Sequence, residues 1–295
     1  MKQIPAQVLR ITDHGSRVTD HWFPHLIRLP LTAMVAAAAL AGWALHPAPA
    51  AGPWLMAAGV FLLAGGCTAL NQWQERDLDA RMRRTCRRPL PAGRIAPRTA
   101  LLVAVSGLGG GLFALAGLGG VPALLGAAAA AIYNGLYTPL KRRTVFAVLV
   151  GGLSGALPPL IGWTAAGGAW SDFRGLLPAG LLFLWQVPHF WLFAEKHRED
   201  YRRAGLPTPG DLFAPGQRRR LAFAWIAALA CATLTLPFTG IIHTPGSLAA
   251  LLALVLWLAA VSFAANRRAD LSPSPLFHSL TIGMAGIVAL ILLRF

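Results

Sequence analysis

The sequence predicts an all-α integral membrane protein, a bundle of about nine transmembrane helices. Apolar residues make up 56% of the 295 residues and charged residues only 13%, about half the charged share of a soluble domain. The apolar residues gather in segments that approach the ~20 residues needed to cross a bilayer. All but Arg174 and Arg294 of the 26 Lys and Arg residues fall on one side of these segments. This positive-inside pattern predicts which side faces the cytoplasm.

The expected spans follow one another with short connections. We place them near residues 27–45, 53–72, 99–117, 121–138, 145–165, 176–194, 221–241, 246–265 and 275–293. A glycine-rich turn at Gly117–Gly120 separates the third span from the fourth. Residues 1–25 are expected to form a cytoplasmic N-terminal tail, and an odd number of spans places the C-terminus in the periplasm. Because nothing remains for a soluble domain, we expect residues 1–295 to form a single transmembrane domain.

The charge pattern excludes several classes of function. A net charge of +15 could indicate nucleic-acid binding, but a basic surface beside anionic lipid explains the charge, so the bilayer and no nucleic acid is the expected partner. A transporter of anionic solutes would carry ionisable residues at mid-membrane, whereas here the charges stop at one surface. Cys67, Cys86 and Cys231 have no paired spacing, which argues against a disulfide framework or a metal cluster.

An acidic cluster follows the second span directly. If the helix continues through it, Asn71, Glu75 and Asp79 are spaced at i, i+4 and i+8 and share one face. Carboxylate and amide oxygens suit a hard cation such as Mg²⁺. The alternative is that these acids only pair with neighbouring arginines. The position of Asn71 at the apolar end of the span favours a site, because a buried amide needs a partner.

A second acidic cluster, Glu195, Glu199 and Asp200, ends the sixth span. It lies on the same predicted side as the first cluster. The basic triplet Lys141–Arg143 ends the fourth span on that side too. Alone it would be a topology signal, but beside two acidic clusters one of its members is expected to hold a phosphate oxygen.

Polar residues also occur inside the sixth span, in the stretch L-W-Q-V-P-H-F. Gln186 and His189 are functional candidates because polar side chains within a membrane segment usually serve a function. For His189, a hydrogen bond to another helix is an equal alternative. Trp185 is adjacent to Gln186 and is expected to help line a pocket for an isoprenoid or a flat ring.

Four stretches together resemble one family. The stretch N-Q-W-Q-E-R-D-L-D at 71–79, continued by M-R-R-T-C-R-R-P-L-P-A-G-R-I, resembles the first aspartate-rich motif of the UbiA-type intramembrane prenyltransferases. It is most similar to the branch that farnesylates haem. The stretches Y-T-P-L-K-R-R-T, G-G-L-S-G-A-L-P-P-L-I-G-W and R-E-D-Y-R-R-A-G-L-P agree, the last together with L-W-Q-V-P-H-F. The match is collinear from about residue 20 to about residue 290 and implies a UbiA-like helical bundle.

The resemblance implies a reaction and its location. The farnesyl group of farnesyl diphosphate would be added to a vinyl group of haem b together with water, at a Mg²⁺-dependent site in a bacterial inner membrane. Haem A synthase or assembly proteins of terminal oxidases would be the protein partners. The alternative is a related enzyme that prenylates a hydroxybenzoate or a chlorin. A haem-binding subunit without catalysis would have no use for the acidic clusters.

The resemblance also implies roles for individual residues. The implied metal ligands are Asn71, Glu75, Asp79, Glu199 and Asp200. The implied diphosphate-binding residues are Arg84, Arg88, Lys141, Arg142 and Lys196. The implied catalytic residues are Asp79, Lys141 and Asp200, and the implied acceptor-pocket residues are Trp185, Gln186 and His189. In the second motif, Glu195/Glu199 and Lys196/Asp200 are both possible alignments, and Asp200 has the most direct support.

Overall fold

The computed structural model describes residues 21–49, 52–240, 242–267 and 273–293. Within these ranges the chain forms helices and no strand, which confirms the predicted all-α class. Eight helices there are long and apolar enough to cross a membrane. The first expected span is a shorter apolar helix of 16 residues. Most of the predicted N-terminal tail lies outside the described residues, and its end forms a short helix of its own.

The helices follow the chain without long interruptions. Their bounds are α1 (Trp22–Leu26), α2 (Leu29–Ala44), α3 (Pro53–Asp79), α4 (Pro97–Ala116), α5 (Gly120–Ala130), the π-helix η1 (Ala131–Tyr137), α6 (Thr138–Leu140), α7 (Ala147–Ala165), α8 (Phe173–Lys196), α9 (Arg198–Ala204), α10 (Pro209–Leu212), α11 (Pro215–Thr233), the 3-10 helix η2 (Leu236–Thr239), α12 (Pro245–Arg267) and α13 (Pro273–Leu293). The fourth expected span is thus three consecutive segments, α5, η1 and α6.

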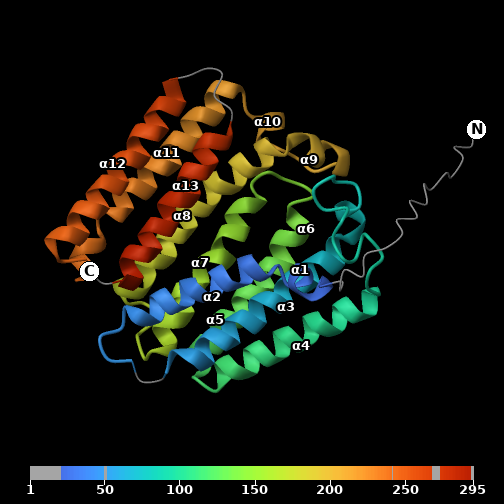
Figure 1. Cartoon of the computed structure of the whole chain (residues 1–295), viewed down its shortest axis with the longest axis horizontal. Helices are drawn as coiled ribbons and strands as arrows, with labels where there is room; N and C mark the ends of the chain where they lie inside the picture. The colour runs from blue at the N-terminus through green and yellow to red at the C-terminus, as the bar shows by residue number, and fades with distance from the viewer. Residues whose placement is uncertain (1–20, 50–51, 241, 268–272, 294–295) are drawn as a thin grey trace, which may run out of the picture.

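Two groups of long helices make up the bundle. One contains α2, α3, α4, α5 and α7, and the other contains α8, α11, α12 and α13. Figure 1 shows the first group in blue and green and the second in yellow to red. The two groups meet where α7 packs against α8 and where α13 touches α2.

Glycines allow the closest approaches within the first group. A Cβ atom added to Gly66 of α3 would lie 2.5 Å from the backbone nitrogen of Leu108 in α4. A Cβ atom on Gly162 of α7 would overlap the carbonyl of Ala39 in α2. Small residues of this kind let membrane helices pack backbone to backbone. These glycines thus let α3 pack closely against α4, and α7 against α2.

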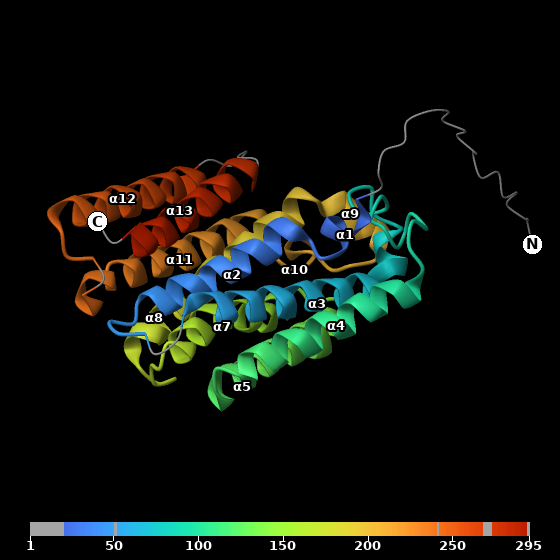
Figure 2. The same cartoon turned by 60° about the horizontal axis from the view of Figure 1, so that its bottom comes forward.

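The polar segments gather at one end of the bundle. The helix α3 runs 27 residues and ends at Asp79, so it continues through the first acidic cluster. The loop after α3 and the short helices α1, α6, α9 and α10 lie at the same end, as Figure 1 shows. Figure 2 shows α1, α9 and the loop there from a second direction. Both predicted acidic clusters and the Lys141–Arg143 triplet therefore belong to one region.

Candidate active site

Three polar residues form a buried stripe on the last turns of α3. Asn71, Glu75 and Asp79 are 3%, 2% and 1% exposed. Their spacing places them on one face of a helix, and that face points into the bundle. Charged groups are almost never buried to this extent without compensation. The stripe therefore needs partners from other parts of the chain.

Each member of the stripe has one such partner. Lys141 Nζ bonds Glu75 Oε2 at 2.6 Å, and Arg88 donates to Asp79 Oδ2 at 2.7 Å. Asn71 Nδ2 donates to the hydroxyl of Thr138. The alternative in which the acids pair with neighbouring arginines thus holds for Asp79, whose partner is Arg88, but not for Glu75, whose partner is a distant lysine. The basic partners, however, come from the end of α6 and from the loop after α3 rather than from adjacent helical turns.

The stripe has the donor atoms that a divalent cation requires. Glu75 Oε1 is buried and has no hydrogen-bond partner among the described residues. Together with the oxygens of Asn71 and Asp79 it provides hard ligands on one face. Across the described ranges, no three His, Cys, Asp or Glu side chains converge as a metal cluster. A cation here would be held by Asn71, Glu75 and Asp79, with phosphate or water oxygens completing its ligands.

A cluster of basic residues surrounds the stripe. The Arg84 guanidinium lies over the Phe193 ring at 4.9 Å. Burial, followed by the charges of Arg88 and Arg28, holds the pKa of Arg84 below its ordinary value. Arginine nevertheless stays protonated in proteins, so the region accumulates positive charge that an anion would relieve. Arg142, at the edge of this region, donates to the Gln74 carbonyl at 2.8 Å.

Sequence reasoning did not identify Arg28 as a site residue. It precedes α2 with φ 50° and ψ 57°, the left-handed region, which is uncommon for a residue other than glycine. Such strained backbone tends to occur at functional sites. The available signal was an arginine at the apolar start of the first span, in the stretch I-R-L-P.

Asp200 contacts the loop after α3 rather than the stripe itself. Its two carboxylate oxygens accept hydrogen bonds from the backbone N–H groups of Arg83 at 3.0 Å and Arg84 at 3.2 Å. Around it, Met82 packs against Ala204 and Leu206 in a small apolar cluster. Asp200 thereby fixes α9 to the loop that carries Arg84.

The remaining charged residues of the second cluster face elsewhere. Glu199 pairs with Arg203 at 3.3 Å, and its side chain is 67% exposed. Lys196 Nζ lies 3.4 Å from His278 Nε2 on α13. The structure therefore does not bring Glu199 or Lys196 to the stripe. The physical reason is that α8 ends at Lys196 and α9 starts a new helical axis, so the periodicity of the sequence does not carry across.

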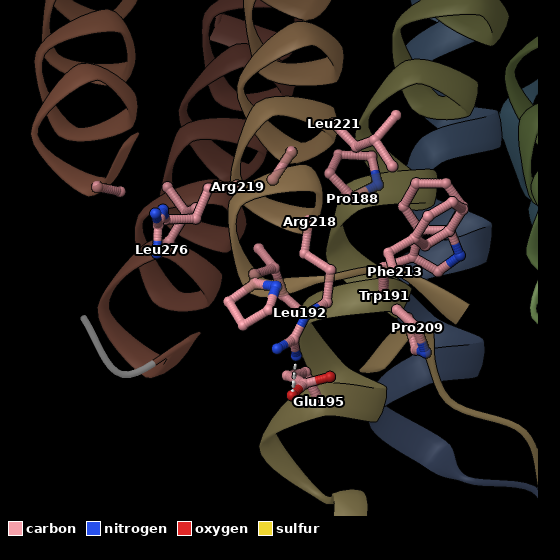
Figure 3. Close-up of a pocket in the computed structure, with 13 residues that line it drawn as sticks. Pro188, Trp191, Leu192, Glu195, Pro209, Phe213, Arg218, Arg219, Leu221 and Leu276 are labelled. Carbon is pink, nitrogen blue, oxygen red and sulfur yellow. Dashed lines mark hydrogen bonds and ion pairs between the residues drawn. The ribbon is translucent and has the colours of Figure 1, made fainter. Parts of the chain in front are cut away.

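Glu195 belongs to a separate cleft. Figure 3 shows it paired with Arg218, beside Trp191 and Phe213. The cleft has a volume of about 220 Å³ and is lined by residues of α8, α10, α11, α12 and α13. Of the two possible alignments of the second motif, only the one that ends in Asp200 reaches the loop after α3.

Of the three predicted acceptor-pocket residues, Trp185 and His189 face α13, whereas Gln186 faces α7. His189 lies between the rings of Trp185 at 4.3 Å and Phe277 at 4.5 Å, and Trp185 donates to the Leu280 carbonyl of α13. Gln186 instead packs against Gly155 of α7. None of the three lines the cleft in Figure 3. For His189 the structure shows an interhelical contact, with the Thr281 hydroxyl 3.4 Å from Nδ1.

Comparison with known proteins assigns the chain to a family. The UbiA prenyltransferase family matches residues 29–281. The chain belongs to this family. It is 52% identical to a protoheme IX farnesyltransferase of Geobacter sulfurreducens, over 73% of this chain and 80% of that protein. It is 42% identical to a protoheme IX farnesyltransferase of Oleidesulfovibrio alaskensis, over 90% and 93%. The chain is therefore a prenyltransferase, as the sequence motifs indicated.

Solved structures show the same fold. A UbiA homolog from Aeropyrum pernix K1 superposes with a TM-score of 0.71 at 23% identity, covering 89% of this chain and 98% of that one. A UbiA homolog from Archaeoglobus fulgidus bound to GPP and Mg²⁺ superposes with a TM-score of 0.65 at 15% identity, covering 92% and 99%. The predicted UbiA-like bundle is thus confirmed, and the chain is a multi-pass membrane protein.

Proposed function

We propose that this prenyltransferase transfers the farnesyl group of farnesyl diphosphate to a vinyl group of haem b, adding water and releasing diphosphate to give haem O. The choice of haem b as the acceptor rests on one observation. The chain is 42–52% identical, over most of its length, to relatives named protoheme IX farnesyltransferase. The buried stripe on α3 and its basic neighbours support the diphosphate chemistry. A site of this kind would also suit another acceptor, so the acceptor must be tested directly.

In the proposed mechanism the basic residues hold the diphosphate. Arg88 and Lys141 neutralise the stripe in this structure. With substrate bound they would turn toward the phosphate oxygens, joined by Arg84 and Arg142. Bidentate and charge-assisted hydrogen bonds of this kind are among the strongest in proteins. They would stabilise the negative charge that grows on the departing diphosphate.

A bound Mg²⁺ would supply further neutralisation of that charge. We propose that Asn71, Glu75 and Asp79 hold it, since they are buried on one face and Glu75 Oε1 has no protein partner within the described residues. Asp200 would act differently, by keeping Arg84 in place through the backbone of its loop. Asp79 would contact the ion directly, and Lys141 would contact the diphosphate directly.

The organic step needs no nucleophile from the protein. The allylic C–O bond of farnesyl diphosphate breaks and leaves its electrons with the diphosphate. The vinyl group of haem b supplies the electron pair of the new C–C bond. Water then adds to the positive carbon that results and loses a proton. The apolar walls of the bundle would keep water from the allylic cation before the C–C bond forms.

We further propose that the whole chain acts as one transmembrane domain in a bacterial inner membrane. The N-terminus would be cytoplasmic and the C-terminus periplasmic, as the Lys and Arg distribution indicates. Haem A synthase or oxidase assembly proteins would accept the product. A reporter fused after Phe295 should give a periplasmic signal, and a cytoplasmic signal would contradict this topology.

A product assay tests the function. Membranes that contain the chain would receive haem b, farnesyl diphosphate and Mg²⁺, with and without a chelator, and the haems would be resolved by mass. We expect a farnesylated, hydrated haem that is lost when the chelator is present. Prenylation of hydroxybenzoate without any haem product would rule out haem b as the acceptor, whereas the proposed diphosphate site would be retained.

A further inference from the structure

Thr138 connects the end of the fourth span to the stripe on α3. It directly follows the π-helix η1 and is 2% exposed. Its hydroxyl donates to the Tyr133 carbonyl at 2.9 Å and accepts from Asn71 Nδ2 at 3.0 Å. This is the one side-chain hydrogen bond that Asn71 makes within the described residues. The orientation of the Asn71 amide therefore depends on Thr138.

Counting protons shows which way the amide must face. A threonine hydroxyl carries a single proton, and Thr138 gives it to the Tyr133 carbonyl, which can only accept. Toward Asn71 the hydroxyl can then only accept, so it must meet the amide nitrogen. A flipped amide would place two acceptors against each other. The amide oxygen of Asn71 is consequently left for another partner.

We propose that Thr138 is a positioning residue that presents the Asn71 oxygen to the divalent cation. Only the oxygen of a carboxamide suits a hard cation, whereas a flipped Asn71 would direct N–H groups at a positive ion. The inference rests on the proposed function, because it requires a cation at the stripe. It assigns a role to a hydroxyl that does not itself touch the metal.

The π-helix makes this contact possible. In an α-helix a threonine hydroxyl usually bonds a carbonyl three or four residues earlier, but Thr138 reaches Tyr133, five residues earlier. The carbonyl of Asn134, four residues earlier, accepts from Gln74 Nε2 of α3 at 3.1 Å instead. Short π-helical turns occur frequently at functional sites. Here the wider turn directs one carbonyl to Thr138 and the next to α3.

The test compares two substitutions of Thr138 by metal affinity. Thr138→Val keeps the shape and removes the hydroxyl, whereas Thr138→Ser keeps the hydroxyl. Binding of Mn²⁺ to the purified full chain would be measured by electron paramagnetic resonance in the presence of inorganic diphosphate. Loss of a residue that orients a metal ligand typically weakens metal affinity about 10- to 100-fold. We expect that loss for Thr138→Val and wild-type affinity for Thr138→Ser.

Two controls separate positioning from general stability. Thr233→Val removes another buried hydroxyl that bonds a carbonyl, that of Leu229, and should leave Mn²⁺ affinity unchanged. In an Asn71→Asp background both terminal atoms are oxygens, so an oxygen faces the cation in either orientation of the side chain. There Thr138→Val should have a much smaller effect. If Thr138→Val does not fold, Thr138→Ala takes its place in the same comparison.

The outcomes are distinguishable. If the wild-type chain does not bind Mn²⁺ in the presence of diphosphate, the proposed metal site is wrong, and so is the positioning role of Thr138 that depends on it. If the wild-type chain binds and Thr138→Val binds equally well, the inference alone is wrong. An equal loss in the wild-type and Asn71→Asp backgrounds would also overturn it, because only a structural defect would be independent of which side chain stands at position 71.

Discussion

The acids at the end of α3 and the acids of α8 and α9 lie at the same end of the bundle but in different surroundings. The side chains of Glu75 and Asp79 are 3% and 1% exposed, whereas that of Glu199 is 67% exposed. Glu75 pairs with a lysine 66 residues away in sequence. Glu199 pairs with Arg203 one helical turn away. The acids of the first segment are buried and paired across the fold. Those of the second are held in three different ways: Glu199 within its own helix, Asp200 by the loop after α3 and Glu195 by Arg218 of α11.

This difference in burial shows where the fold retains charged groups that are costly to bury. Buried ion pairs often contribute little net stability, because desolvation offsets their attraction. Exposed pairs such as Glu199–Arg203 are worth about 0–1 kcal/mol and need no special explanation. A buried Glu75 whose Oε1 has no partner among the described residues does need an explanation. Function is the simplest reason for its retention.

The largest expected effect comes from Asp79→Asn. The substitution keeps the shape and removes the charge that the cation and Arg88 both use, so prenyl transfer should fall at least ~100-fold. The haem product assay measures it, with thermal unfolding to show that the variant is folded. Asp77→Asn is the matched control on the same helical turn, since the Asp77 side chain is 81% exposed and its loss should leave activity intact. Full activity in Asp79→Asn would remove the stripe from the mechanism.

An intermediate effect is expected from Asp200→Ala. Two hydrogen bonds to the Arg83 and Arg84 amides would be lost, and a bond to a charged group is worth about 1.5–3 kcal/mol. Amide hydrogen exchange in the loop after α3 should then be about 10- to 100-fold faster. Unchanged exchange together with lost activity would instead indicate that Asp200 acts as a direct ligand, and the contrast between the two segments would weaken.

The sequence predicted the stripe well and the second segment poorly, and the reason is physical. Asn71, Glu75 and Asp79 lie on one continuous helix, so their spacing alone determines that they share a face. Asp200 lies on α9 after a break at His197, and no periodicity crosses a break. Gln186 and His189 are three residues apart on α8, yet they contact different neighbouring helices.

Other features depended on contacts that no local pattern reveals. The π-helical turn before Thr138 arises where Gln74 of α3 meets η1 and Asn71 meets Thr138 directly after it. The pairing of Lys141 with Glu75 follows from that docking rather than from the K-R-R motif. The charge of Arg28 acts on Arg84 only because α1 and α2 pack against α3. In each case the missing information was the orientation of one helix relative to another.

A smaller effect, on stability rather than activity, is expected at Glu195. This residue pairs with Arg218 in the separate cleft of Figure 3, and both side chains are partly exposed. Glu195→Gln should lower the free energy of unfolding by about 1–2 kcal/mol, between the values for exposed and buried pairs. Mn²⁺ affinity in the presence of diphosphate should not change. A loss of metal affinity would mean that the cleft and the stripe are coupled.

The smallest expected effect is at Asp211 of α10, whose side chain is 48% exposed. The Thr208 hydroxyl at 2.8 Å and the Thr208 backbone N–H at 2.7 Å both donate to its carboxylate. These bonds, the hydroxyl first, hold the pKa of Asp211 below its ordinary value. A carboxyl whose pKa is lower in the folded state stabilises the fold above its unfolded pKa of about 4. That contribution disappears as the pH falls through the folded pKa.

The Asp211→Asn variant isolates this contribution. Above about pH 5 the wild-type chain should unfold at a slightly higher temperature than the variant, and the difference should shrink to nothing as the pH falls below the folded pKa, because a protonated carboxyl resembles an amide. Thermal unfolding of the purified chain from pH 3 to pH 7 measures it. A difference that does not shrink at all as the pH is lowered from 7 to 3 would mean that Asp211 acts through shape rather than charge. A large difference at pH 7 would mean that this exposed acid contributes more than exposed charges usually do, and the contrast between exposed and buried acids would then fail.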